Sequence, residues 1–296
     1  MEISIPVSDT AHSAQANSDS ASVAAAARTG QPDRYLAALL ASPEQREALL
    51  ALAALGAELS SIPSRTVREP AMGEIRRQWW RDTLALPPET STGHPVADAV
   101  RKARRSHDLP AVLIAALIDA HSPLFDGSSS LAEDALHDLL WSAEGTLFAL
   151  GAQVVGLPAT PDVHASCVAS GQAYGLARLL FDQPRMLAQG RILLAKAQLD
   201  AAGLTVEDLR AGAADARIER LLKDCSAQIR RSFDVARSFA ASLPRPARVA
   251  FLPLALVEPY LRSLERTGPD LLRKEAGVAP FTRVRRIAAA HLFGCL

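Results

Sequence analysis

A long apolar seam runs through the middle of the chain. Apolar side chains recur there at alternating spacings of four and three residues, at Leu136, Leu140, Ala143, Leu147, Leu150 and Val154. This is the spacing of one face of an α-helix. Ser130 and Glu133 form a capping box ahead of the seam, which predicts where the helix starts. A seam this continuous needs two or more neighbouring helices to bury it, so the chain is constrained to a helical bundle.

A second amphipathic helix is predicted over residues 69–84, EPAMGEIRRQWWRDTL. One face carries Met72, Ile75 and Trp79, and a neighbouring stripe carries Arg76, Trp80 and Leu84. Adjacent helical residues point about 100° apart, so one tryptophan can face a core while the other faces a neighbour or a cavity. The simplest interpretation is a core helix with a charged outer face.

The remaining periodic segments also predict helices, and no stretch shows a convincing strand alternation. We expect these helices at 42–59, 94–106, 110–121, 160–182, 196–202, 206–211, 215–243, 246–267 and 280–296. Pro63 should end the first of them, and Pro253 and Pro259 should kink the helix of 246–267. Residues 1–30 are rich in Ser and Ala and predict a disordered tail. The fold prediction is a single all-α domain over residues 31–296.

The charge balance gives no general preference for a partner. Lys+Arg and Asp+Glu both number 32, and no basic run is interleaved with aromatic residues, so we expect no nucleic acid. Helix 94–106 carries Arg101, Lys102, Arg104 and Arg105. These residues could contact phosphate, although a solvated helix face is the commoner outcome.

The C-terminal segment, residues 280–296, is basic and amphipathic. It sets the apolar residues Phe281, Val284, Ile287 and Leu292 opposite Arg283, Arg285 and Arg286. Docking on the domain is the favoured interpretation, and peripheral contact with an anionic membrane is the alternative.

Three features bear on the compartment. The longest apolar runs, Ala48–Leu55 and Ala111–Ile118, are too short to cross a bilayer. The N-terminus lacks a basic region followed by an apolar core, so a secretory signal is not expected. Cys167, Cys225 and Cys295 are far apart and odd in number, which favours reduced thiols. We therefore expect a cytoplasmic protein, with any membrane contact peripheral at the inner membrane face.

The segment EPAMGEIRRQWWRD resembles a signature of the squalene/phytoene synthase superfamily. Three further segments resemble that family: WSAEGTLFALGAQVVG at 141–156, GQAYGLARLLFDQPRMLAQGRILL at 171–194 and FLPLALVEPYLR at 251–262. Within the superfamily, the chain is similar to a divergent branch related to a mitochondrial complex I assembly factor. The resemblance implies an isoprenoid-synthase-like helical bundle with a central cavity.

Active members of this superfamily condense two prenyl diphosphates and need carboxylate pairs one helical turn apart on two facing helices. Those pairs hold Mg²⁺, which neutralises the diphosphate as it leaves. Here the first acidic motif would fall on residues 60–64, Ser-Ser-Ile-Pro-Ser, and Glu58 nearby has no partner acid. Neutral serines do not replace a Mg²⁺-binding carboxylate pair.

The second acidic motif is only partly present. Asp182 stands where the first aspartate is expected, but Arg185 and Met186 occupy the later acidic positions. Tyr174 matches an aromatic position, whereas Arg178 stands where a polar amide is usual. Asp182 is thus the only retained acid, and we assign no catalytic residue. The resemblance places six residues near the cavity: Trp79, Trp80, Tyr174, Arg178, Asp182 and Arg191.

Other chemistry is not indicated by the residue pattern. The acid pairs Asp134/Asp138 and Asp215/Glu219 lie near helix starts and are more simply explained as helix-dipole acids. The seven histidines are scattered, and no Gly-rich phosphate loop or nucleophile elbow is present.

The leading hypothesis is a catalytically degenerate member of the superfamily that works through binding. By resemblance, it would assist assembly of a respiratory membrane complex, with a subunit of that complex as partner and a lipid or prenyl chain as possible ligand. No cofactor is then expected. The alternative is a Mg²⁺-dependent prenyl diphosphate transferase of the phytoene or squalene synthase type. A third alternative is a peripheral membrane adaptor that uses residues 280–296.

Overall fold

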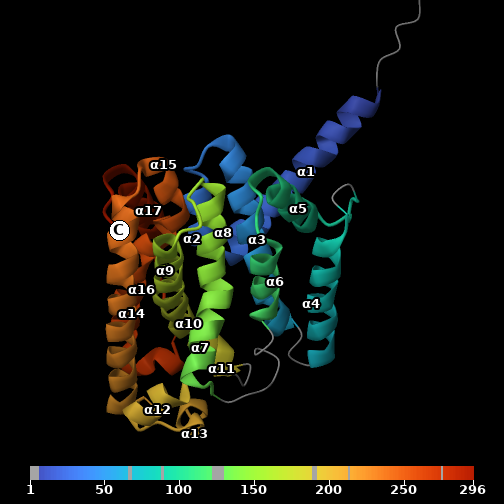
Figure 1. Ribbon diagram of the computed structural model, residues 1–296. Coiled ribbons are helices and arrows are strands. Elements are labelled where there is room, and N and C mark those ends of the chain that lie inside the picture. The colour runs from blue at the N-terminus through green and yellow to red at the C-terminus, as the bar shows by residue number, and fades with distance from the viewer. Residues whose placement is uncertain are drawn as a thin grey trace, which may run out of the picture.

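The computed structural model describes residues 7–65, 69–87, 90–121, 130–188, 192–212, 214–274 and 276–296. Within these ranges the chain is helical, and its only strand-like pairing is an isolated bridge between Leu131 and Ala195. Figure 1 shows the long helix α14 along one edge of the bundle and α4 along the opposite edge, with α12 and α13 together at one end. The all-α prediction is confirmed.

The first half of the described chain contributes helices of both hydrophobic clusters. They are α1 (Val7–Gly30), α2 (Pro32–Ala38), α3 (Pro43–Arg65), α4 (Pro70–Ala85), α5 (Pro95–His107), α6 (Ala111–Asp119), α7 (Glu133–Leu140), the π-helical turn η1 (Trp141–Gly145) and α8 (Thr146–Val154).

The second half contributes shorter helices and the long α14. They are α9 (Pro161–Ser170), the π-helical turn η2 (Gly171–Gly175), α10 (Leu176–Phe181), α11 (Gln183–Ala188), α12 (Lys196–Ala202), α13 (Val206–Arg210), α14 (Ala216–Ser242), α15 (Arg245–Arg248), the 3-10 helix η3 (Val249–Leu256), α16 (Val257–Thr267), the 3-10 helix η4 (Gly268–Leu272) and α17 (Pro280–Phe293).

The expected disordered tail is wrong for residues 7–30, which form α1. Its C-terminal end packs on α3 and buries Val23 and Ala27. Gly30 lies so close to α3 that an added Cβ would stand 2.4 Å from the Cβ of Ala57. Alanine has the highest helix propensity, and small side chains allow two helices to approach closely. The small residues that made this segment resemble a tail therefore allow α1 to pack closely on α3.

Prolines change the helices less sharply than expected. Helix α3 continues through Pro63 to Arg65, because a proline in the last turn removes a single backbone hydrogen bond. Around Pro253 the chain becomes the 3-10 helix η3 instead of a kinked α-helix. Pro259 lies in the first turn of α16, where its missing N–H has no intrahelical partner to lose.

The predicted seam is confirmed as α7, η1 and α8, and it crosses α9 and η2 at their closest approach. The capping box at Ser130 and Glu133 is wrong, because α7 begins at Glu133 with Ala132 as its N-cap and no side-chain cap. A Cβ on Gly171 would lie 2.6 Å from the backbone nitrogen of Gly145. Gly171 is therefore required by the distance between the two backbones, whereas a Cβ on Gly145 would first meet the Trp141 ring, at 2.5 Å. Both crossing helices widen into a π-turn at this point, a feature often found at functional sites.

Two hydrophobic clusters form the core of the described chain. One is centred on η2, α10, α14, η3 and α16 and includes Phe148, Tyr174 and Phe251. The other is centred on α3, α4, α5 and α6 and includes Leu55 and Trp80. None of the described helices combines the length and the apolar character needed to traverse a bilayer. Cys167, Cys225 and Cys295 are all free, as expected.

Candidate functional site

A charged group lies between α2 and the two π-turns, at the middle of the bundle. The Arg34 guanidinium on α2 donates to the Glu144 carboxylate on η1 at 2.7 Å. Arg178 on α10 lies 3.5 Å from the other Glu144 oxygen and donates to the side-chain carbonyl of Gln31 at 2.6 Å. The Arg34 guanidinium also stacks over the Phe148 ring, 4.5 Å from its centroid. One carboxylate is therefore shared by two arginines.

The electrostatics of this group favour an ionised Glu144. Burial by itself raises the pKa of the Glu144 carboxyl, since it disfavours the charged form. The positive charges of Arg34 and Arg178, with the hydrogen bond from Arg34, outweigh burial and hold the pKa of Glu144 below its usual value. Glu144 thus remains an anion and offsets part of the positive charge of the two arginines.

A second group is built around Asp33, the preceding residue on α2, whose side chain is 1% exposed. Its carboxylate accepts hydrogen bonds from the hydroxyls of Tyr174 on η2, at 2.9 Å, and of Tyr260 on α16. Arg283 on α17 pairs with the other carboxylate oxygen and donates to the Tyr260 hydroxyl at 2.9 Å. The short helix α2, together with the preceding Gln31, therefore connects η1, η2, α10, α16 and α17.

The two tyrosines act as donors in this arrangement. Burial, followed by the negative charge of Asp33, raises the pKa of Tyr174 and of Tyr260 above the usual tyrosine value. Both hydroxyls keep their protons at neutral pH and can donate to the carboxylate. This is a structural network, because its donors and acceptors are already paired with one another.

The positions of the expected acidic motifs do not fit a Mg²⁺ pair. The hydroxyl of Ser60 donates to the carbonyl of Ala57 and that of Ser61 to the carbonyl of Glu58, so both turn back on α3. Asp182 forms an ion pair with Arg185 at 3.1 Å. In the ranges that the structure describes, no three His, Cys, Asp or Glu side chains gather where they could hold a metal. Mg²⁺ binds to several oxygen ligands, and these positions do not supply them.

Of the six residues expected at the cavity, the structure brings Tyr174 and Arg178 together. Trp79 and Trp80 lie elsewhere on α4, where both rings contact His94, and Trp80 belongs to the cluster of α3, α5 and α6. Asp182 lies at the end of α10, half-buried. Arg191 lies outside the described residues.

The space beside the charged group is small. A cavity of about 20 Å³ adjoins Arg34 and is walled by α2, α3, α8 and η3. Arg34 and small or apolar residues line it, and the room left is about that of one water molecule. The central cavity implied by the resemblance is therefore nearly filled at this place.

Sequence reasoning missed Asp33, Arg34, Glu144, Tyr260 and Arg283. Only Glu144 carried a usable signal, since it is an acid inside the most continuous apolar helix of the chain. A buried acid in such a segment requires a partner. The other four look like ordinary surface residues in the sequence.

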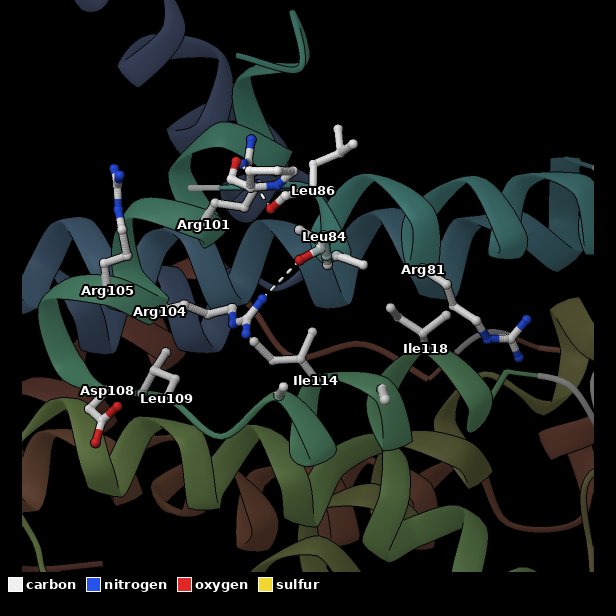
Figure 2. Close-up of a pocket in the computed structure, with 14 residues that line it drawn as sticks. Arg81, Leu84, Leu86, Arg101, Arg104, Arg105, Asp108, Leu109, Ile114 and Ile118 are labelled. Atoms are coloured by element: carbon white, nitrogen blue, oxygen red, sulfur yellow. Dashed lines mark hydrogen bonds between the residues drawn. The ribbon is translucent and has the colours of Figure 1, made fainter. Parts of the chain in front are cut away.

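The basic helix α5 borders a groove of about 670 Å³ between α4, α5 and α6. Figure 2 shows the Arg104 guanidinium directed at the carbonyl of Leu84, to which it donates at 2.8 Å. Arg101 is buried and donates to the carbonyls of Leu86, Pro87 and Thr90. Arg81 pairs with Asp119 at the edge of the groove. Arg101 and Arg104 thus donate to backbone carbonyls in the last turn of α4 and just after it, so neither phosphate contact nor simple solvation describes them.

The explanation of Asp215 and Glu219 as acids at a helix start is confirmed. Asp215 caps the helix by accepting from the backbone N–H of Arg217 at 2.8 Å, and it pairs with the Arg217 side chain. Asp134 lies in the first turn of α7, where its carboxylate accepts from the N–H of Ala135.

The chain is similar to known proteins over most of its length. The sequence pattern described as squalene/phytoene synthase matches residues 27–285. The chain is 28% identical over 240 residues to "NADH dehydrogenase (ubiquinone) complex I, assembly factor 6" of Bos taurus, covering 80% of this chain and 71% of that protein. It is 25% identical over 251 residues to the Drosophila melanogaster homolog, covering 82% and 74% of the two chains.

Solved structures show the same fold. A dehydrosqualene synthase in complex with ligand superposes with a TM-score of 0.79 at 16% identity, covering 93% of this chain and 95% of the other. The squalene synthase HpnC from Alicyclobacillus acidocaldarius superposes with a TM-score of 0.70 at 19% identity, covering 86% and 96%. At these identities the likeness concerns the fold alone.

Proposed function

This chain belongs to the squalene/phytoene synthase family, and we propose that it serves as an assembly factor for a respiratory NADH dehydrogenase complex, without prenyl transfer activity. The observation that carries the proposal is the replacement of the metal-binding acids. Serines that bond to their own helix occupy one motif position, and the single aspartate of the other motif is paired with Arg185.

Loss of those acids removes the main source of catalysis for this reaction class. Ionising an allylic diphosphate requires positive charge at the leaving group, which Mg²⁺ and its carboxylates supply. Within the described residues, Arg34 and Arg178 are cations at the middle of the bundle, and Glu144 already offsets their charge. A diphosphate would have to displace that carboxylate in order to use them.

The names of the relatives support the assembly role. The mammalian and insect proteins compared above are named for the assembly of complex I, and each matches about four-fifths of this chain. We propose that the partner is a subunit of such a complex and that the protein works in the cytoplasm. We include no lipid or prenyl chain beside Arg34 in this proposal, because the cavity there measures about 20 Å³.

The enzymatic alternative is tested by turnover. Purified protein with Mg²⁺ and radiolabelled farnesyl or geranylgeranyl diphosphate should form no condensed product. A synthase of the same fold serves as the positive control under the same conditions. Product that disappears in Asp182→Ala would mean that unrecognised groups replace the missing acids, and the proposal would fail.

The assembly role is tested by deleting the gene in the source organism. Membranes of the deletion strain should lose NADH:quinone activity and the intact complex on native gels, while succinate dehydrogenase activity serves as an unchanged control. Wild-type protein supplied in trans should restore the complex, and Asp182→Ala should restore it equally. An unchanged level of the NADH dehydrogenase complex in the deletion strain would refute the proposal.

A further inference from the structure

The outer face of α17 is apolar. Phe281, Val284, Ala288 and Leu292 follow one another at helical spacing and form one stripe. Phe281 is 76% exposed, Leu292 53% and Val284 50%. Helices on protein surfaces normally turn their polar face to water. This stripe is therefore the reverse of what a solvated helix presents.

The opposite face of α17 fixes the helix in this orientation. Ile287 and Ala290 are buried, and the helix packs on η3 and α2. Arg283 points inward and pairs with the buried Asp33. The prediction that residues 280–296 dock on the domain is confirmed for α17. Rotating the helix to hide the stripe would break this ion pair and expose Ile287.

A groove of about 790 Å³ lies beside the stripe, between α16 and α17. Four arginines line it: Arg262, Arg266, Arg285 and Arg286. Glu265 also lines the groove, but its carboxylate pairs with Arg230 on α14 at 2.7 Å, and the nearby Glu258 carboxylate pairs with the same arginine at 3.6 Å. Within the described ranges, the side chains of Arg262 and Arg285 make no ion pair. The groove therefore concentrates positive charge on a chain whose formal net charge is zero.

The electrostatics of Arg286 support this description. Burial lowers the pKa of its guanidinium, and the positive charges of Arg262 and Arg285 lower it further. Like charges are thus held close together with too little negative charge between them. An anion entering the groove would relieve that repulsion.

We propose that this face docks on an anionic bilayer, with lipid phosphates in the arginine groove and the stripe of α17 in the boundary between headgroups and acyl chains. A guanidinium group can donate two parallel hydrogen bonds to two oxygens of one phosphate. Aromatic and aliphatic side chains favour the boundary between headgroups and acyl chains. The inference is independent of the proposed function.

Two other occupants fit less well. A second copy of the chain would bring two sets of arginines together across a symmetric interface, where like charges repel. A protein partner would need roughly 800 Å² on each side for a stable interface, which the four side chains of the stripe do not supply. A fluid anionic surface satisfies both the charge and the exposed apolar side chains.

The test is co-sedimentation of the full-length protein with vesicles of phosphatidylcholine alone or mixed with phosphatidylglycerol. We expect pelleting with the anionic vesicles only, and release by high salt. Each arginine near a membrane surface contributes about fivefold in binding, so Arg262→Gln with Arg285→Gln should weaken binding by about 25-fold. Phe281→Ser with Leu292→Ser should weaken it by about tenfold.

Matched controls make the same chemical changes on other surfaces. Arg76→Gln with Arg220→Gln removes two exposed arginines from α4 and α14. Val112→Ser with Val235→Ser removes two exposed apolar side chains from α6 and α14. Both controls should pellet like the wild type, and circular dichroism should show all variants folded.

Several outcomes would overturn the proposal. They are no pelleting of the folded wild type, equal pelleting with neutral vesicles, or equal weakening in the control variants. Calorimetric titration with inorganic phosphate separates the two sources of phosphate. If free phosphate binds with the same dependence on Arg262 and Arg285 while vesicles do not bind, the groove takes a soluble anion and the bilayer proposal fails.

Discussion

The Arg34–Glu144–Arg178 group offers the sharpest stability prediction. Glu144→Gln keeps the size of the side chain and its ability to accept a hydrogen bond from Arg34. It removes the negative charge that two largely buried arginines share. The variant should therefore be destabilised by uncompensated positive charge, because packing is nearly unchanged.

The magnitude follows from the distances. At an effective dielectric constant near 20, charges 2.7 and 3.5 Å apart attract with gross energies of about 6 and about 5 kcal/mol. Desolvation of the three groups cancels a large share of that attraction. Removing one member of a buried ion pair costs about 3–5 kcal/mol in net stability. For a domain of this size, with about 2 °C for each kcal/mol, Tm should fall by about 6–10 °C.

The assay is urea unfolding of both proteins across a pH series. The folded-state pKa of Glu144 is lowered by its arginines, so its contribution is complete above the unfolded-state pKa of about 4.3 and is lost as pH falls through the folded-state pKa. The stability difference between wild type and Glu144→Gln should be constant above about pH 5 and shrink at more acidic pH.

An exposed ion pair provides the control. Glu47 pairs with Lys102 at 2.6 Å, and both side chains are about two-thirds exposed. Glu47→Gln should cost less than about 1 kcal/mol at any pH. If Glu144→Gln were no more destabilising than Glu47→Gln at neutral pH, the central ion group would not stabilise the fold and the reasoning would be refuted.

Three further predictions concern particular positions. Gly171→Ala would place a Cβ 2.6 Å from the backbone of η1, and it should lower the free energy of unfolding by about 1–3 kcal/mol or more in the same urea assay. Asp182→Ala removes a half-exposed ion pair and should change stability by less than about 1 kcal/mol; a larger loss would give Asp182 a structural role not seen here. Burial raises the pKa of Cys167 and of Cys225 to about 12, so iodoacetamide at pH 8 should alkylate Cys295 alone in the native protein, as read by mass spectrometry.

Most of the helices could be predicted from the sequence, because their signals are local. The spacing of the seam from Leu136 to Val154 and the amphipathic pattern of residues 69–84 predicted helices that the structure contains. The family resemblance also depended on contiguous segments, and the match over residues 27–285 confirms it. The absence of the acids at residues 60–64 and 185–186 could also be predicted, because those motifs are contiguous in the sequence.

The errors came where packing overrides composition. Ser and Ala at residues 7–30 suggested disorder, yet a neighbouring helix gives α1 a surface on which Val23 and Ala27 are buried. Trp79 and Trp80 were grouped with Tyr174 by resemblance, whereas the structure places Trp80 in the other hydrophobic cluster and leaves Trp79 exposed. Propensity describes a segment alone, and these outcomes depended on what lies beside it.

The tertiary structure alone decided which charges meet. Asp33 and Arg283 are 250 residues apart in the chain, and Arg34 and Glu144 are 110 apart. In the sequence each looks like a surface charge, since local pattern does not record a partner on another helix. The sequence therefore determined a helical member of the family without its metal-binding acids. The tertiary position of α2, whose Asp33 and Arg34 side chains reach the two π-turns, determined that ion pairs hold the middle of the bundle. A buried charge is stable only where a distant segment brings its counter-charge.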